Sequence, residues 1–399
     1  MTGPLDGVRV VELGLWVAGP SCSAILADWG AEVIKVEPLT GDPFRSLEWL
    51  YPGNINPPFE LDNRGKRSIA LDISTLAGRE IMGRLLQDAD VFVTNYRPGG
   101  LERAGLDYRT LHQQFPRLIY GAVTGYGLDG PDRDRHAYDV GAFWSRAAVA
   151  HTLTPEGQDL PYQRGGMGDH MTGMSVAGGI SAALFQREKT GEGQLVLGSL
   201  MRLGTYMLGW DHNVTARLDV DVPPTNRKGP ANPLINGYRC GDGKWMWLLG
   251  LEGERHWPDV LRALGHPEWA TDPRFATIAT RVANTIELTA AIEAALATRP
   301  RAEWGEIFDA ENVWWAAVQS TLDMRHDDPQ ARAIGCWIDV PTADGGTVEM
   351  VASPIDFPEN PWSVDRPVPE LGQDTELVLM ELGLDWEAID GLKEAGVIP

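Results

Sequence analysis

The segment Gly168-Asp169-His170 combines the residue types expected at a nucleophilic site. The run of small residues that follows predicts a tightly packed helix as far as Phe185, with Asp169 at its N-cap, where aspartate is favoured. An N-cap aspartate usually has only that structural role. If the helix N-terminus faces a cleft, its N–H groups and dipole could stabilise developing negative charge. A carboxylate nucleophile flanked by glycine would then leave room for a bulky substrate.

Two loops could contribute to the same site. Gly14–Pro20 follows a predicted strand and precedes a predicted helix, which is where open α/β sheets bind ligands. It lacks the GxGxxG spacing, so a dinucleotide is only weakly indicated. His136, Tyr138 and Asp139 fall within four residues, and a histidine near a carboxylate can do acid–base work. Taken alone, each segment is more typical of an ordinary turn.

A third group follows another predicted strand. Arg97 and Arg103 could meet phosphate groups, and Tyr96, next to Asn95, could stack on an adenine ring. A surface turn explains the same residues equally simply. Whether these residues form a binding site therefore depends on which other elements lie next to them.

Strands and helices alternate through the first half of the chain. The β-branched and apolar runs predict strands at residues 8–13, 32–37, 68–72, 89–95 and 118–125. Helical spacing is predicted at residues 21–30 and 76–87. Strand–helix–strand units of this length predict a parallel sheet covered by helices, and thus a doubly wound α/β domain.

The second half has a different pattern. Proline, glycine and polar residues dominate 219–233 and predict a linker, and residues 234–250 predict a β-hairpin with its turn at Cys240–Lys244. Residues 254–325 are mostly helical, a strand follows at 347–351, and the last predicted helix covers 374–382. Trp304, Trp314 and Trp315 are expected in a core or interface, with a substrate wall as the alternative.

Composition excludes several classes of function. A net charge of −22 argues against nucleic acid or an anionic membrane as the main partner, since both need a basic face. The three cysteines are far apart and lack metal-site spacing, so no zinc site or disulfide framework is expected. The N-terminal residues do not resemble a signal peptide, and no apolar run has the length of a membrane span. A cytoplasmic protein without a metal is therefore expected.

Several strings occur in an order that resembles one family over nearly the whole chain. They include VVELGLWVAGP, GAEVIKVEP, NRGKRSIALD, ADVFVTNYRPGGLERAGLDY, GDHMTGM, NPLINGYRCGDGKWMWL and LKEAGVIP. The chain resembles the family III (CaiB/BaiF) CoA-transferases. Within that family, GDHMTGM and NPLINGYRC look closest to transferases of small organic acids, such as formyl-CoA:oxalate and 2-hydroxyacid CoA-transferases.

The resemblance implies a set of site residues. The catalytic aspartate of the family matches Asp169. The coenzyme A contacts match Trp16, Val17, Ala18, Leu71, Asp72, Asn95, Tyr96, Arg97, Arg103, His136 and Tyr138. Coenzyme A would be present as an acyl-CoA co-substrate, with a small organic acid as the second substrate and no metal.

The resemblance also implies an architecture. A large Rossmann-like domain would be formed by both chain ends, residues 1–205 and 326–399. A linker, 206–233, would lead to a smaller middle α+β domain at 234–325. Two chains would form an interlocked homodimer with each active site between domains of different subunits.

The sequence departs from the family at three places. Pro38 and Ser74 stand where some relatives carry basic residues, so Arg45, Arg64 or Lys66 is a candidate for the missing phosphate charge. The stretch matching the glycine-rich covering loop of some relatives, Gly250–Trp257, has only two glycines. The aromatic segment Asn312–Val318 hints at a pocket for a larger or aromatic acyl group.

The implied reaction proceeds on Asp169. Its carboxylate attacks an acyl-CoA, giving first a mixed anhydride and then an aspartyl-CoA thioester, with backbone N–H groups of His170–Thr172 expected as oxyanion donors. A 2-methylacyl-CoA racemase is the first alternative. The racemases of this family have a histidine directly before the aspartate, but Tyr138 precedes Asp139 here. An acyl-CoA thioesterase is the second alternative.

Overall fold

A six-stranded parallel sheet forms the centre of the larger part of the molecule. The computed structural model describes residues 3–53 and 55–399, and within them the strand order is β3-β2-β1-β4-β5-β6. The strands are β1 (Arg9–Leu13), β2 (Glu32–Glu37), β3 (Arg67–Ala70), β4 (Val91–Thr94), β5 (Ile119–Thr124) and β6 (Leu195–Ser199). This order is that of Rossmann-type sheets and reverses between β1 and β4. The predicted parallel sheet is confirmed.

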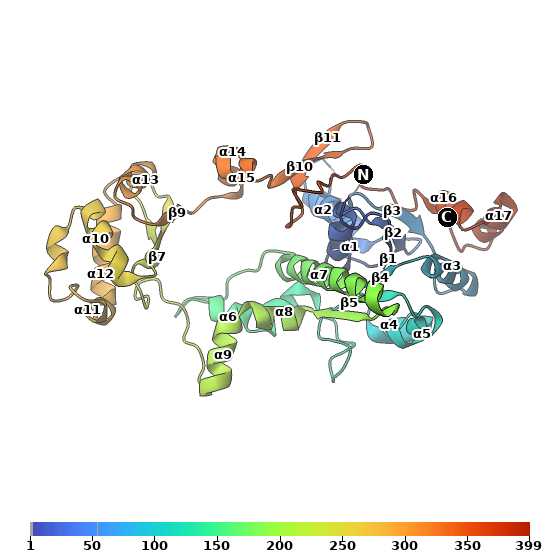
Figure 1. The fold of residues 1–399 in the computed structure, drawn as a ribbon, viewed down its shortest axis with the longest axis horizontal. Coiled ribbons are helices and arrows are strands. Elements are labelled where there is room, and N and C mark those ends of the chain that lie inside the picture. Colours follow the sequence, from blue (N-terminus) through green and yellow to red (C-terminus); the bar gives the residue numbers. More distant parts are fainter. Residues whose placement is uncertain (1–2, 54) are drawn as a thin grey trace. The chain divides into compact units, whose positions relative to one another are not determined.

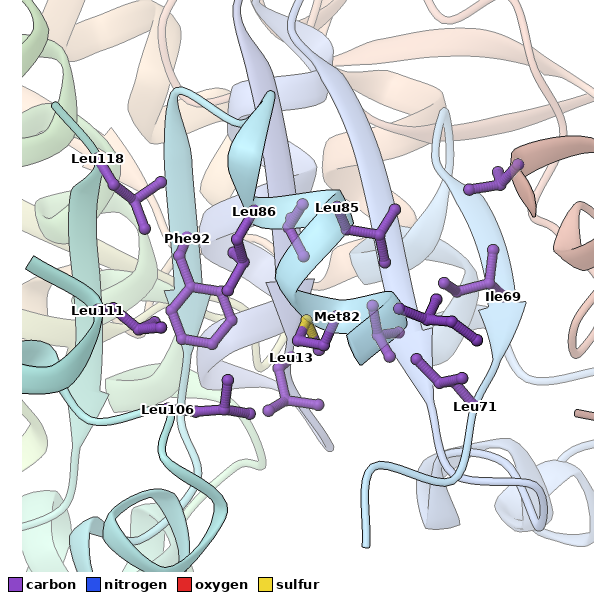
Figure 2. Packing of buried hydrophobic residues seen from close by; sticks show 14 of the residues in the cluster. Leu13, Ile69, Leu71, Met82, Leu85, Leu86, Phe92, Leu106, Leu111 and Leu118 are labelled. Carbon is purple, nitrogen blue, oxygen red and sulfur yellow. The ribbon is translucent and has the colours of Figure 1, made fainter. Parts of the chain in front are cut away.

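Helices cover both faces of this sheet because successive residues of its strands point to opposite sides. Val11 faces a core shared with α3 (Leu76–Gln87), α5 (Tyr108–Gln114), α16 (Thr375–Glu381) and α17 (Trp386–Glu394). Figure 2 shows leucines of this core packed around Phe92 and Met82. Val10 faces the second core, which includes α1 (Ala18–Asp28) and α7 (Met167–Thr190).

Helices α1 and α7 lie side by side on their face of the sheet (Figure 1). Their approach depends on Gly173. A Cβ added there would lie 2.2 Å from the Ser21 hydroxyl and 2.9 Å from the Cys22 nitrogen. This close packing fixes the position of the α7 N-terminus relative to the loop between β1 and α1.

The C-terminal residues pack against the same sheet. The Asp374 N–H donates to the Ser68 carbonyl, and the Asp72 N–H donates to the Val397 carbonyl, both on the β3 side. A hairpin of β10 (Trp337–Pro341) and β11 (Thr347–Val351) precedes them, and the Val351 carbonyl accepts a bond from Arg64. Contacts therefore group the described residues up to Ala150, Tyr162–Val220 and Gly335–Pro399 into one compact unit.

The second compact unit comprises His151–Pro161 and Asp221–Ile334. Its antiparallel sheet contains β7 (Ile235–Arg239), β8 (Trp245–Leu249) and β9 (Trp315–Ala317). Its larger helices are α10 (Gly253–Leu264), α12 (Thr285–Leu296) and α13 (Arg301–Ala310). The predicted hairpin at 234–250 is confirmed, and Trp304 is a core residue as expected, whereas Trp314 leaves 47% of its surface exposed.

Three predictions of local structure need correction. Helix α1 begins at Ala18 rather than Ser21, and a second C-terminal helix, α17, follows the one predicted at 374–382. The range predicted as a linker, 206–233, contains helix α9 (Gly209–Leu218). The stretch that matches the covering loop of some relatives, Gly250–Trp257, continues into helix α10, and its His256 and Trp257 are buried.

Candidate active site

A cavity of about 400 Å³ opens at the carboxyl ends of β1, β4 and β5. This is the edge of the sheet, at the reversal of strand order, where open α/β folds bind ligands. The cavity brings together nine of the predicted site residues, namely Trp16, Val17, Ala18, Asn95, Tyr96, Arg97, His136, Tyr138 and Asp169. Loops far apart in the sequence thus meet at one site.

The loop between β1 and α1 forms one wall of the cavity and is held in an unusual conformation. Trp16 has a φ of 63°, in the left-handed region that non-glycine residues rarely adopt. The Asn95 side chain donates to the Leu15 carbonyl and accepts from its N–H, at 2.7 and 3.0 Å. The Trp16 N–H donates to Asp42 at 3.0 Å. These bonds compensate for the strained backbone and fix the loop.

A buried group of charges lies beneath this loop. The ammonium of Lys35 donates to Glu12, Asp42 and the Gly14 carbonyl at 2.9–3.0 Å. The ammonium of Lys66 donates to Glu12 at 2.7 Å and to the Pro20 carbonyl at 2.8 Å. Burial alone would raise the pKa of Glu12, but the two lysines hold it below its usual value. We call Glu12, Lys35, Asp42 and Lys66 the lysine network.

The three cations considered as phosphate ligands all have partners within the protein. Lys66 is 1% exposed and Arg64 is 2% exposed, and both are paired internally, Arg64 with Asp28 at 2.7 Å. Arg45 donates to both carboxylate oxygens of Glu37 at 2.7 and 2.8 Å. All three cations therefore serve pairs inside the fold.

Asp169 lies in the first turn of α7 and is partly buried. The predicted N-cap role was wrong, because the helix starts at Met167 and its N-cap is Gly166, with a φ of 79°. A carboxylate in the first turn is nevertheless favoured by the helix dipole. The His170 N–H, expected as an oxyanion donor, instead donates to the Gly166 carbonyl within the helix at 2.9 Å.

Asp139 occupies the anion-binding position at this helix end. Both of its carboxylate oxygens lie 3.2 Å from the Gly168 nitrogen, whose N–H they accept. Gly168 has to be glycine, since an added Cβ would lie 2.3 Å from Phe143 Cγ and 2.5 Å from Asp139 Oδ1. The sequence marked Asp139 as one of three clustered polar residues but gave no sign of this capping role.

Three carboxylates and one imidazole surround the N-terminus of α7. Burial, followed by the negative charge of Asp139, raises the pKa of Asp169 to about 7. Burial also raises the pKa of Asp139, although the hydrogen bonds that its carboxylate accepts act in the opposite direction. The His170 ring lies 3.0 Å from Asp62, which holds the pKa of His170 above its usual value despite burial.

Tyr138 and Arg97 form the opposite wall with His136. The Tyr138 ring meets the Trp16 ring edge-on, with centroids 5.9 Å apart. Arg97 donates to His136 Nε2 at 3.2 Å, and because a guanidinium can only donate, this geometry places the histidine proton on Nδ1. Arg133 and Arg135 also line the cavity. The alternating acidic and basic residues at 132–136 (DRDRH) could have indicated these two arginines as site residues.

Three predicted residues lie outside the residues that line the cavity. The Leu71 side chain is buried in the hydrophobic core, as Figure 2 shows. The Asp72 side chain accepts from the Ser74 N–H at 2.9 Å, and Arg103 is an exposed residue of α4 (Pro98–Ala104). Their assignment to the site stays a prediction.

Among the described residues, no group of histidine, cysteine, aspartate and glutamate side chains has the arrangement of a metal site. None of the described helices combines the length and the apolar character that a membrane crossing requires.

Comparison with known proteins identifies the relatives of this chain. Residues 5–375 match the family model described as CoA-transferase family III. The (R)-2-hydroxy-4-methylpentanoate CoA-transferase of Clostridioides difficile is 32% identical, with 99% of each chain covered. The cinnamoyl-CoA:phenyllactate CoA-transferase of Clostridium sporogenes is 31% identical over 98% of this chain and 97% of its own. The crystal structure of a CAIB/BAIF family protein from Brucella suis superposes with a TM-score of 0.82 at 32% identity, covering 96% of this chain and all of that one.

Proposed function

This chain belongs to CoA-transferase family III, and we propose that Asp169 is the nucleophile on which it transfers coenzyme A. The chain is an enzyme whose substrates are CoA thioesters and carboxylic acids. The observation that supports Asp169 is its position. It is the carboxylate that reaches the cavity from the first turn of α7, facing the loop of Trp16 and the wall of Tyr138.

The first half-reaction loads coenzyme A onto the enzyme. The Asp169 carboxylate attacks the thioester carbonyl of the donor, the carbon–sulfur bond breaks, and CoA thiolate leaves from a mixed anhydride. The thiolate then attacks the aspartyl carbonyl, which releases the donor acid as a carboxylate and leaves an aspartyl-CoA thioester. The thioester energy is retained in each intermediate, so no nucleotide triphosphate is consumed.

The second half-reaction repeats these steps in reverse. The acceptor carboxylate attacks the aspartyl thioester and displaces the thiolate, and the thiolate attacks the acceptor acyl carbonyl to give the new acyl-CoA and free Asp169. We propose that Trp16, Val17, Ala18 and Asn95 hold the coenzyme along the β1–α1 loop. Tyr96, Arg97, His136 and Tyr138 would contact it from the opposite wall.

The substrates named for the relatives suggest the class of carboxylic acid that this enzyme uses. Two of them are named for 2-hydroxy acids, one with a branched aliphatic and one with an aromatic side chain. We propose a 2-hydroxy acid with an apolar side chain as one substrate of this enzyme.

The assembly is a separate proposal. We propose that the enzyme is a cytoplasmic homodimer of interlocked chains. In each chain, the unit that contains the parallel sheet would be the large domain, and the unit of His151–Pro161 and Asp221–Ile334 would be the small one. Light scattering would report the mass of the assembly directly, and a monomer at working concentration would contradict it.

Covalent labelling tests the nucleophile. The enzyme is incubated with a panel of acyl-CoA donors, treated with hydroxylamine, and mapped by peptide mass spectrometry. Modification is expected at Asp169 and is expected to vanish in Asp169→Asn, with turnover lowered roughly 10³-fold or more because no covalent intermediate can form. Asp129→Asn, at an exposed loop position, is the matched control and should label normally.

Assays of turnover with the same donors distinguish this mechanism from the alternatives. Full turnover by Asp169→Asn would exclude this mechanism. Loss of acyl-CoA at the same rate with and without an acceptor acid would indicate a thioesterase, and exchange of the α-proton without an acceptor would indicate a racemase.

A further inference from the structure

Asp62 is a buried carboxylate for which the mechanism so far has no use. It belongs to α2 (Pro57–Asn63) and is 2% exposed. Its Oδ1 lies 3.0 Å from His170 Nε2, whereas its Oδ2 is buried with no hydrogen-bond partner among the described residues. A buried carboxylate is costly unless a partner compensates for its charge. The hydrogen bond to His170 is therefore the feature that needs an explanation.

His170 is fixed next to the nucleophile. It follows Asp169 in the first turn of α7, and its ring packs closely against the helix start. A Cβ added to Gly166 would lie 3.1 Å from His170 Cε1 and 3.7 Å from Val17. The charged groups that act on the imidazole are Asp62 from α2, Asp169 from α7 and Asp139 from the preceding segment, all negative. Burial raises the pKa of Asp62, and the hydrogen bond and charge of His170, followed by the charges of Lys66 and Lys35, act against that rise.

We propose that Asp62 and His170 form an ion pair whose imidazolium keeps the neighbouring Asp169 ionised, and thus nucleophilic, near neutral pH. Both are positioning residues, since neither has to touch the substrate for this effect. The inference rests on the proposed role of Asp169 and adds the charge control that this role requires.

The electrostatics of the site support this role. A protonated carboxyl group cannot attack a thioester, and burial together with Asp139 raises the pKa of Asp169 to about 7 even with His170 beside it. The positive charge of His170 acts in the opposite direction and lowers that pKa. Asp62 stabilises the charged imidazole through a charge-assisted hydrogen bond. Without His170, a smaller fraction of Asp169 would be ionised at any pH near neutrality.

The pH dependence of kcat/KM shows in which direction His170 shifts the pKa of Asp169. Removal of the imidazolium raises the pKa of Asp169, so the acid limb of kcat/KM moves to higher pH. For His170→Asn we expect roughly tenfold lower kcat/KM at pH 6 and less than a twofold loss at pH 9, where Asp169 is ionised in both proteins. Asp62→Asn should change the profile in the same direction but by less. It removes the carboxylate that keeps His170 charged, and it also removes the weaker direct effect by which the Asp62 charge raises the pKa of Asp169.

The substrate for these profiles is the acyl-CoA donor that labels Asp169 most strongly. Asp28→Asn is the matched control, because Asp28 is an equally buried carboxylate that pairs with Arg64 and is not among the groups that shift the pKa of Asp169 or His170. It should lower stability without moving the acid limb. A loss of equal size at every pH in His170→Asn and Asp62→Asn, or unchanged profiles in both, would overturn the proposal.

A second measurement is independent of turnover. The chain has eight histidines, and NMR titration of histidine-labelled enzyme can assign His170 by its absence in His170→Asn or His170→Gln. His170 should titrate above the usual value near 6.5 and shift downward in Asp62→Asn. A neutral His170 at pH 7, or no response to Asp62→Asn, would overturn the ion pair while leaving the labelling of Asp169 intact. Failure of that labelling would instead reject the proposed function and leave the histidine titration interpretable.

Discussion

Two clusters of buried charge lie close to the same loop, and they differ in their balance. The lysine network has two carboxylates and two ammonium groups, and each ammonium also donates to a backbone carbonyl, that of Gly14 in the loop or that of Pro20 in α1. The cluster at the α7 N-terminus has three carboxylates, Asp62, Asp139 and Asp169, but a single imidazole. The balanced cluster stabilises a backbone conformation, whereas the unbalanced cluster leaves one carboxyl group with a pKa in the range of catalysis.

This difference separates structural from catalytic use of buried charge. In the lysine network, close partners of opposite charge lower the pKa of Glu12 and raise that of Lys35 despite burial, and both shifts favour the charged forms. Burial and the charge of Lys35 lower the pKa of Lys66, which Glu12 opposes. Around Asp169, burial and like charges act together and favour the neutral form of the acid. Variants in the two clusters should therefore affect different measured quantities.

The largest effect on stability is expected from breaking the lysine network. Glu12→Gln removes the carboxylate that pairs with both lysines and leaves two buried ammonium groups with too little negative charge. We expect the free energy of unfolding to fall by about 3–5 kcal/mol, measured by urea denaturation. If the loss were below about 1 kcal/mol, the network would not be the element that fixes the Trp16 loop.

A second test compares two glycines of helix α7. Gly168→Ala places a methyl group 2.3 Å from Phe143 and should displace the helix start, with a loss of about 1–3 kcal/mol and a lower rate of Asp169 labelling. Gly178→Ala is the matched control, since nothing lies within 4 Å of its added Cβ. It should raise the free energy of unfolding by up to about 1 kcal/mol, because alanine favours helix. Equal effects of the two substitutions would contradict the close packing at the site.

The smallest effect is expected from changing the charge of Asp139. Asp139→Asn keeps an oxygen that can accept the Gly168 N–H but removes a negative charge beside Asp169. The pKa of Asp169 should fall, so the acid limb moves to lower pH, opposite to the shift expected for His170→Asn. We expect roughly threefold higher kcat/KM at pH 6, relative to its value at pH 9, than in the unaltered enzyme. A shift to higher pH would show that Asp139 does not act through its charge.

Much of the fold could be predicted because it depends on local pattern. The strands β1 and β2 are apolar runs buried on both faces, and the hairpin of β7 and β8 has a clear turn sequence. The start of α1 was misplaced because Gly19 and Pro20 suggested a loop. Proline is in fact tolerated in the first turn, where its missing N–H has no helical partner to lose.

The site was predictable in its membership but not in its electrostatics. Nine predicted residues line the cavity, and most of them lie directly after β1 or β4 or in the first turn of α7. The partners of buried charges could not be predicted, since Lys66 and Glu12 are 54 residues apart and His170 and Asp62 are 108 apart. No periodicity connects such pairs, so the sequence left Lys66 and Arg64 as candidates for phosphate binding although both are buried in internal ion pairs.

The central claim is that Asp169 forms the covalent intermediates. It is tested most directly by following the carboxylate oxygens of the acceptor acid. An acceptor acid labelled with ¹⁸O in its carboxylate is turned over with an acyl-CoA donor, and the peptide that contains Asp169 is weighed. In the proposed mechanism the acceptor oxygen bridges to Asp169 in the anhydride and stays on it when the thiolate attacks the acyl carbonyl. The peptide therefore gains about 2 Da in a single turnover and approaches a gain of about 4 Da over many turnovers, because each cycle passes one Asp169 oxygen to the released donor acid. Turnover without any gain of ¹⁸O at Asp169 would contradict the mechanism.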